Sequence, residues 1–363
     1  MKLISVLFFT TTTIVSYSQT VGTHLQPNAK ATAFPFISIS PDAVSSGMGE
    51  IGAAINPNAN AFHWNTANLG FTDQSGEVSL SYSPWLKQLA DNIHLIYLSG
   101  YAKLNENSKH IFGGTIRYLT DGNNVNSSTG SLETSTNFEI LGGYAYRISD
   151  NSAIGINGKY IYANALMVSN PDSLEIAPSQ VGGLDISYRY RSQPYLIGEL
   201  TTFWSWGTSI SNLGNKTTYS TLNNRDFLPT NLRVGGSFEM IKGENHAFLV
   251  GADLNKLLVP DSDWNGLGAL PGMVKSFTDN EDGLRGELEE ITIGVGLTYS
   301  YKDFLNFRTG YFYENPNQGA RRFINFGAGV QLKSIEINAS YLASLTQNNP
   351  QANTIRLGVS YGF

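Results

Sequence analysis

A strict alternation of apolar and polar residues is the feature that most constrains how this chain can fold. From about Glu77 onward, segments of roughly ten residues carry apolar side chains at every second position, as in 291–301 and 355–363. Successive side chains of a β-strand point to opposite faces, so each segment has one apolar and one polar face. Fourteen segments have this pattern: 76–83, 93–104, 109–119, 136–148, 152–163, 181–191, 198–210, 230–240, 246–256, 289–301, 304–314, 322–332, 334–344 and 353–363.

Charged residues keep to the polar face of these segments, and Lys103, at a strand end, is the exception. A lipid-facing Arg or Lys at the bilayer midplane costs about 2–4 kcal/mol, so a membrane barrel keeps its charges in the lumen. A soluble β-sandwich would instead expose the charged face to solvent. The charges with lumen parity are Arg117, Glu139, Arg147, Lys159, Asp185, Arg189, Glu199, Arg233, Glu239, Asp253, Arg308, Glu336 and Arg356.

The lengths of the connections decide between these two folds. After the first segment they run roughly 9, 4, 16, 3, 17, 6, 19, 5, 32, 2, 7, 1 and 8 residues, so long and short connections alternate. Outer-membrane barrels have short periplasmic turns, longer outer loops and an even number of strands. Only 14% of residues are charged, against about 25% in ordinary soluble domains. The sequence therefore predicts an all-β, 14-stranded transmembrane antiparallel β-barrel in the outer membrane, with both termini in the periplasm.

Two segments precede the predicted barrel at 76–363. Residues 1–18 resemble a secretory signal peptide, with Lys2, an apolar stretch and small residues before Gln19; an N-terminal strand is the competing interpretation. Residues 19–75 are apolar, but their prolines and glycines break any long helix or strand. Fourteen strands enclose a lumen wider than side chains alone can fill, so we expect 19–75 to form a plug inside the barrel.

The apolar face also carries aromatic residues near the strand ends. Pairs such as Tyr160 and Tyr162, or Trp204 and Trp206, have lipid-facing parity. Amphipathic rings concentrate at membrane interfaces, so these pairs indicate aromatic girdles rather than a sugar-binding path in the lumen.

The longest connection, 257–288, contains a candidate partner-binding site. Exposed apolar residues on a long loop often mark an interaction surface. The alternative is a loop that folds back to cap the lumen. The candidate residues are Trp264, Leu267, Leu270, Pro271, Met273, Val274 and Phe277.

The sequence offers no constellation for catalysis, metal binding or a cofactor. The five histidines have no metal-ligand spacing, and no nucleophile elbow is present. Carboxylates and arginines that share a lumen face usually form ion pairs rather than acid–base pairs. The formal charge of −6 gives no reason to expect nucleic-acid binding.

A motif in the plug resembles the PorV family of the type IX secretion system, which is known from Bacteroidetes and belongs to the FadL-like barrels. The detailed motif match covers about residues 34–70. The order of the segments, a plug followed by fourteen strands, resembles the family over the whole mature chain. This chain has Thr66 where the family usually has a proline, which leaves the local geometry of the plug open. The motif residues are Phe34, Pro35, Phe36, Pro41, Asp42, Gly47, Met48, Gly49, Trp64 and Asn65.

The resemblance implies a role in protein export. PorV-like proteins bind a very large translocon barrel of the SprA type and accept cargo proteins bearing a C-terminal sorting domain. They pass this cargo to a surface attachment complex, and outer-membrane lipid surrounds the barrel. Two other functions stay open: a FadL-like channel for uptake of hydrophobic small molecules, and an outer-membrane lipid-modifying enzyme, for which no nucleophile and base are evident.

Overall fold

A computed structural model describes residues 30–87, 93–125, 132–164, 178–218, 225–261, 266–346, 349 and 351–363. The segment predicted to be a signal peptide, Trp264 and the start of the predicted plug lie outside these residues. One antiparallel sheet dominates the fold. It closes on itself through pairing of β1 with β15 and of β6 with β8, so the predicted fourteen-stranded barrel is confirmed.

The wall consists of fourteen strands, and a short additional strand, β7 (Tyr195–Ile197), pairs with β8 alone. The wall strands are β1 (Gly76–Pro84), β2 (Ile93–Lys103), β3 (His110–Val125), β4 (Leu132–Arg147), β5 (Ser152–Asn164), β6 (Ser179–Arg191), β8 (Leu200–Gly214), β9 (Asn231–Lys242), β10 (His246–Leu257), β11 (Thr292–Tyr301), β12 (Leu305–Tyr313), β13 (Arg322–Leu332), β14 (Ile335–Ser344) and β15 (Ile355–Gly362).

The two faces of the wall have the predicted polarity. In β1, Val78 and Leu80 are about half exposed on the outer face, whereas Ser79 and Ser81 are buried against the lumen contents. Arg117 and Glu139, on neighbouring strands, are likewise buried inside. A soluble protein would have the opposite arrangement, so the outer surface is suited to lipid.

Three local features differ from the sequence-based expectation. β3 and β4 run beyond the predicted segments, through residues that lack apolar alternation. β7 continues the direction of β6 after a break, and together with β8 it forms a hairpin at the rim. Glu199 is therefore not a lumen residue: it lies in the β7–β8 turn, where its side chain is 85% exposed beside Lys242.

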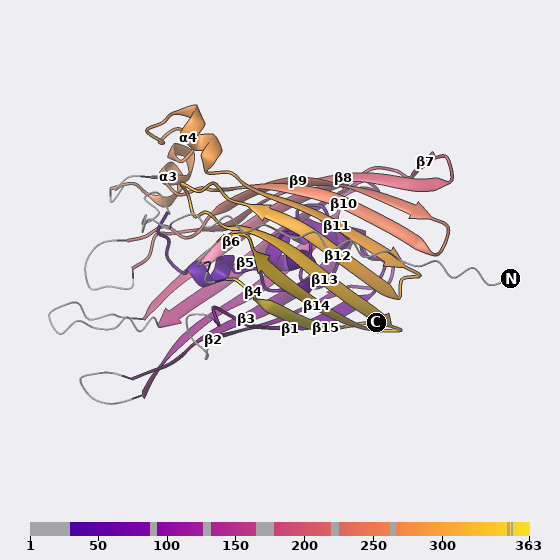
Figure 1. Ribbon diagram of the computed structural model, residues 1–363, viewed down its shortest axis with the longest axis horizontal. Coiled ribbons are helices and arrows are strands. Elements are labelled where there is room, and N and C mark those ends of the chain that lie inside the picture. The colour runs from indigo at the N-terminus through magenta and orange to yellow at the C-terminus, as the bar shows by residue number, and fades with distance from the viewer. Residues whose placement is uncertain are drawn as a thin grey trace, which may run out of the picture.

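The barrel has two distinct ends, which Figure 1 shows at the left and the right. We call the end with the short turns and Phe363 the turn end, and the opposite end the loop end. At the loop end, the connection between β10 and β11 contains two short helices, α3 (Ala269–Lys275) and α4 (Leu284–Glu289). Residues 258–290, which include both helices, are called the cap.

Residues 30–75 run through the lumen and are called the plug. They form the 3-10 helix η1 (Pro35–Ser38), the helices α1 (Ala43–Ser46) and α2 (Ala61–Trp64), and the 3-10 helix η2 (Thr66–Phe71). The plug is drawn in indigo within the barrel in Figure 1. Among the described residues, no helix is long and apolar enough to span a membrane.

Candidate functional site: the plug and the cap

Arginines of the barrel wall bind the irregular backbone of the plug. Arg117 donates to the carbonyl oxygens of Phe36, at 3.0 Å, and of Ile37. Arg356 donates through Nε to Ser40, at 3.1 Å, and Arg233 donates through Nη1 to Glu50, at 3.0 Å. Arg189 donates to the carbonyl oxygen of Ile55. Since most plug carbonyls have no helix or sheet partner, these charged donors supply the bonds that burial requires.

Carboxylates of the wall accept hydrogen bonds from the backbone N–H groups of the plug. Asp253 accepts from the backbone N–H groups of Gly52, at 2.7 Å, and Ala53, at 2.9 Å. Glu77 accepts from the N–H of Ala59 at 3.2 Å. The wall charges also pair with one another: Lys159 lies 3.0 Å from Asp185, and further lumen pairs are Lys159–Glu139, Arg117–Glu139, Arg233–Asp253, Arg191–Glu239 and Arg308–Glu336. Several of the predicted lumen charges, among them Arg117, Arg189, Arg233, Asp253 and Arg356, thus bind the plug.

Asp42 and Trp64 of the predicted plug motif are in direct contact. Asp42 caps α1, because its Oδ1 accepts from the N–H groups of Val44 and Ser45, both at 2.9 Å. Its Oδ2 accepts from the indole N–H of Trp64 at 2.6 Å. Asp42 is fully buried, so one carboxylate joins the two halves of the plug.

Asn65 and Thr66 begin the last helix of the plug. Asn65 caps η2 by accepting from the N–H of Ala67 at 3.0 Å, and it donates to the carbonyl oxygen of Ala53 at 2.6 Å. Thr66 is the first residue of η2, a position where proline is favoured. Its hydroxyl donates to Asn157 of β5 at 2.9 Å. The family's usual proline and this threonine therefore suit the same backbone, and the threonine adds a bond to the wall.

Gly47, Met48 and Gly49 lie where the plug backbone comes close to the wall. Gly49 has a φ of 70°, and a Cβ atom there would lie 2.6 Å from the carbonyl oxygen of Val295. Met48 is buried, and its sulfur accepts from Thr298 at 2.9 Å. Backbone-to-backbone approach of this kind requires glycine, which explains the Gly-Met-Gly pattern.

The first turn of the plug fills the apolar part of the lumen at the loop end. Phe34, Phe36 and Ile37 pack in one buried cluster with wall residues, and Pro35 opens η1. The wall residues of this cluster are Trp85, Leu95, Leu119, Ile161 and Ala163, with Leu228 beside them. This volume, which a channel for apolar molecules would need for its ligand, is occupied by the chain's own side chains.

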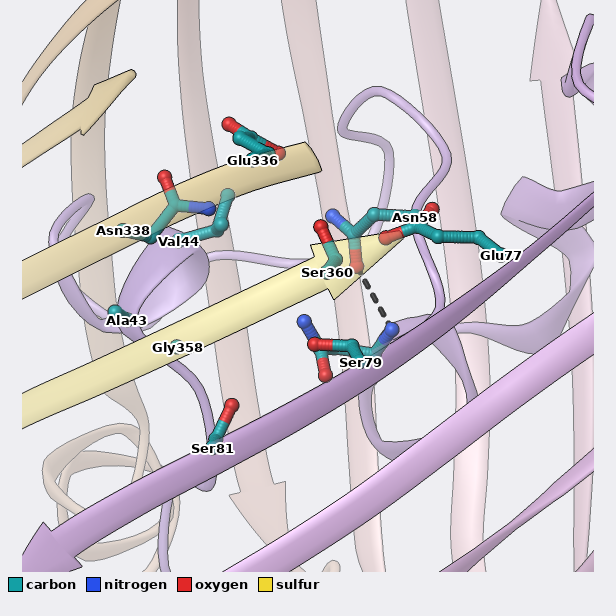
Figure 2. Close-up of a pocket in the computed structure, with 11 residues that line it drawn as sticks. Ala43, Val44, Asn58, Glu77, Ser79, Ser81, Glu336, Asn338, Gly358 and Ser360 are labelled. Carbon is teal, nitrogen blue, oxygen red and sulfur yellow. Dashed lines mark hydrogen bonds between the residues drawn. The ribbon is translucent and has the colours of Figure 1, made fainter. Parts of the chain in front are cut away.

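A small polar pocket remains between the plug and the inner faces of β14, β15 and β1. Figure 2 shows Glu77, Ser79 and Ser360 on the wall side and Asn58 on the plug side. Glu336 and Asn338 complete the wall side. The lining is hydrophilic, so this pocket suits water or small polar solutes rather than an apolar ligand. Among the described residues, no group of His, Cys, Asp and Glu has the arrangement of a metal site.

The cap is held to the start of the plug by buried ion pairs. The Nζ of Lys30 lies 2.7 Å from Glu290 and 3.0 Å from Asp261, and it also donates to the carbonyl oxygen of Val259 at 2.7 Å. Lys256, at the end of β10, pairs with Glu290 and, at 2.8 Å, with Glu287. The described part of the cap is therefore connected to the plug by buried ion pairs.

These contacts set the charges of the two central carboxyl groups. Burial opposes ionisation of Glu290, but hydrogen bonds from Lys256, Lys30 and Asn280 outweigh it and lower the pKa of Glu290. Burial raises the pKa of Asp261, and the contact with Lys30 offsets only part of that effect. Glu290 is accordingly the anion on which both lysines converge.

The two sides of the cap differ in polarity. Met273 is buried, and Gly272 lies against the ring of Phe227, whose carbonyl oxygen accepts from the N–H of Ala33 in the plug. On the outer side, Leu270 is 70% exposed and Val274 is 73% exposed. The connection 257–288 was predicted either to bind a partner or to fold back over the lumen, and each interpretation describes part of it. One side of the cap covers the lumen, and the other side exposes apolar side chains.

The predicted binding residues fall on both sides. Leu270, Pro271, Val274 and Phe277 are exposed, Leu267 is half-buried, and Met273 faces inward, contrary to what an exposed site requires. The sequence analysis missed Leu284 and Leu288 of α4, which are 76% and 59% exposed. Their spacing of four residues, like that of Leu270 and Val274, is the signal that could have revealed an apolar helix face. We call Leu270, Val274, Phe277, Leu284 and Leu288 the exposed cap face.

Comparison with known proteins decides the family. The model of the family "Type IX secretion system protein PorV" matches residues 23–263. The chain belongs to the PorV family. Family and fold together identify an outer-membrane β-barrel of a secretion-system family. A search of curated proteins gave no match.

Solved structures support the fold of this PorV-family barrel. The Pseudomonas putida toluene transporter TodX has 12% identity and a TM-score of 0.51, with 88% of this chain and 97% of that chain covered. A TodX mutant described as a monoaromatic hydrocarbon channel has 15% identity and a TM-score of 0.51, with coverage of 88% and 98%. A Pseudomonas aeruginosa FadL homologue has 11% identity and a TM-score of 0.45, covering 93% and 100%. At these identities, the similarity to the two TodX structures establishes the architecture alone.

Proposed function

We propose that this barrel binds the large translocon of the type IX system and receives cargo proteins with a C-terminal sorting domain, which it delivers to the surface attachment complex. Membership of the PorV family supports the secretion role. The observation that carries the binding site is the exposed cap face, where four large apolar side chains project from two short helices at the loop end and Phe277 follows α3. In this proposal the loop end faces the cell exterior and both termini face the periplasm.

The exposed cap face has the properties of a protein-binding surface. Its side chains are costly to leave in water, while the opposite side of the same helices is fixed by Met273 and by the ion pairs of Lys30 and Lys256. A rigid support lowers the entropy that a partner must overcome on binding. The cap is thus prepared to bind without refolding.

A pull-down from native outer membranes tests this proposal. The tagged full chain, extracted in mild detergent, should co-purify a very large barrel or proteins that share a C-terminal sorting domain. Replacing Leu270, Val274 and Phe277 by serine should reduce this recovery at least tenfold. Leu196→Ser is the matched control, because Leu196 is 73% exposed on β7 at the opposite end. Unchanged recovery with the triple variant would contradict the proposal.

Uptake of hydrophobic small molecules is the second candidate, because the fold resembles that of a toluene transporter. The plug cluster around Phe34 and Phe36 opposes it, since it occupies the apolar part of the lumen. The same purification distinguishes the two functions: a barrel without protein partners that carries an apolar molecule would favour uptake.

A further inference from the structure

Two copies of one side-chain arrangement lie on the lipid-facing surface at the turn end. In the first, His110 and Phe112 at the start of β3 lie opposite Tyr146 and Tyr144 at the end of β4. The ring of His110 lies 4.9 Å from that of Tyr146 and 6.0 Å from that of Tyr144, and Phe112 lies 5.0 Å from Tyr144.

The second copy repeats this pattern on β10 and β11. His246 and Phe248 lie opposite Tyr301 and Tyr299. The ring of His246 lies 5.4 Å from that of Tyr301 and 6.0 Å from that of Tyr299, and Phe248 lies 4.8 Å from Tyr299. Around the wall, β3 and β10 are six strands apart in one direction and eight in the other, so the two clusters are on nearly opposite sides.

Each histidine is oriented by a hydrogen bond. The Nδ1 of His110 lies 2.7 Å from the hydroxyl of Tyr144, and the Nδ1 of His246 lies 2.8 Å from the hydroxyl of Tyr299. A tyrosine hydroxyl that donates to Nδ1 leaves the ring proton on Nε2. The imidazole then has one N–H donor free to act beyond the cluster.

A lysine adjoins each cluster in the sequence, and at the second cluster its side chain contacts one of the rings. Lys109 directly precedes His110, and its carbonyl oxygen accepts from the N–H of Arg147. Lys302 directly follows Tyr301, and its Nζ lies 5.4 Å from the centre of that ring. An N–H donor, a lysine and exposed aromatic faces together fit a headgroup that combines a phosphate with a cationic amine, because the rings attract the amine and the lysine attracts the phosphate.

We propose that each cluster binds the phosphodiester headgroup of one glycerophospholipid. The Nε2–H of the histidine donates to a phosphate oxygen, the lysine supplies the countercharge, and the aromatic rings lie beside the glycerol and the amine. Assignment of these lipids to the periplasmic leaflet rests on the orientation in the proposed function. The binding chemistry itself does not depend on the cap or its partners.

Native mass spectrometry of the full chain, released from outer membranes in mild detergent, tests this inference by counting bound phospholipids. The wild type should retain two, His110→Phe and His246→Phe should each retain one, and the double variant none. Phenylalanine keeps the ring packing and removes the donor. Tyr144→Phe, which removes only the orienting hydroxyl, should shorten lipid retention at its own cluster.

His94→Phe is the matched control. His94 also bonds a tyrosine, with its Nδ1 2.9 Å from the hydroxyl of Tyr82, but it lies at the start of β2 at the loop end. This variant should retain both phospholipids. Folding of every variant is checked by its heat-dependent mobility on a gel.

Any one of the following results would overturn the inference: a wild type without bound phospholipid, a folded double variant with an unchanged phospholipid count, or loss of lipopolysaccharide in place of phospholipid. Displacement by inorganic phosphate alone would show a site for free phosphate and would also contradict it. The cap-dependent pull-down should be unaffected by the double variant, so failure of this inference and failure of the proposed function are distinguishable.

Discussion

Asp42 shows how much of the plug depends on single residues. Its carboxylate caps α1 and accepts from the indole of Trp64. Loss of the helix N-cap of α1 and of one charge-assisted hydrogen bond costs about 2–4 kcal/mol of folding free energy in total. Asp42→Ala should therefore loosen the plug while the barrel stays folded.

Hydrogen-exchange mass spectrometry checks this expectation. Amides of residues 40–50 should exchange faster in Asp42→Ala, with the wall strands unchanged. Asp73→Ala is the control, since Asp73 is an exposed acid at the end of the same segment. Equal protection in the wild type and in Asp42→Ala would contradict the role given to this carboxylate.

Gly49 provides a second test at the residue scale. Alanine at a positive φ costs about 1 kcal/mol, and at Gly49 its Cβ would also lie 2.8 Å from the backbone N of Tyr311. Gly198 has a φ of 60°, but its missing side chain faces open space. Gly49→Ala should thus displace the plug, and Gly198→Ala should not.

The measurement is again amide exchange, now over residues 47–53, together with the gel mobility of the folded barrel. Similar exchange over residues 47–53 in the two alanine variants would mean that alanine at position 49 leaves the plug in place, which would contradict the close contact with the wall.

At the scale of elements, the link between plug and cap is the least expected feature. Removing one partner of a buried ion pair destabilises the folded state by about 3–5 kcal/mol. The loss in Lys30→Met should lie near the lower end of this range, because Lys256 still pairs with Glu290. We expect protease cleavage within the cap to accelerate, whereas the barrel resists.

Lys242→Met is the matched control for this prediction. Lys242 is 60% exposed and pairs with an exposed carboxylate at the rim, and such surface pairs contribute little. If cap cleavage rose as much in Lys242→Met as in Lys30→Met, the plug–cap link would not be what orders the cap.

Elements of the wall could be predicted because period-two alternation is a local property of the sequence. The ends of β3 and β4 could not, since polar residues beyond the apolar band no longer alternate. The short β7 could not either, because its three consecutive apolar residues have no alternation. The plug motif was recognised, but its contacts were not: Asp42 meets Trp64 only after the chain has folded against the wall. The burial of Met273 likewise depends on the tertiary structure of the cap.

At the scale of the whole molecule, the two ends of the barrel carry different structural features. The loop end carries the cap and the apolar start of the plug, and the turn end carries the two histidine–tyrosine clusters. The plug fills the lumen between them and is held by charges of the wall. Such a barrel is better suited to presenting a surface than to conducting apolar molecules.

The central claim is that the exposed cap face binds protein partners in the membrane. Its most direct test is a photo-crosslinking amino acid placed at Val274 in cells, with the same probe at Leu196 as the comparison. The account predicts that Val274 crosslinks to a very large barrel or to proteins with a C-terminal sorting domain, and that Leu196 gives neither. Lipid adducts alone at Val274, or identical protein adducts at both positions, would contradict it.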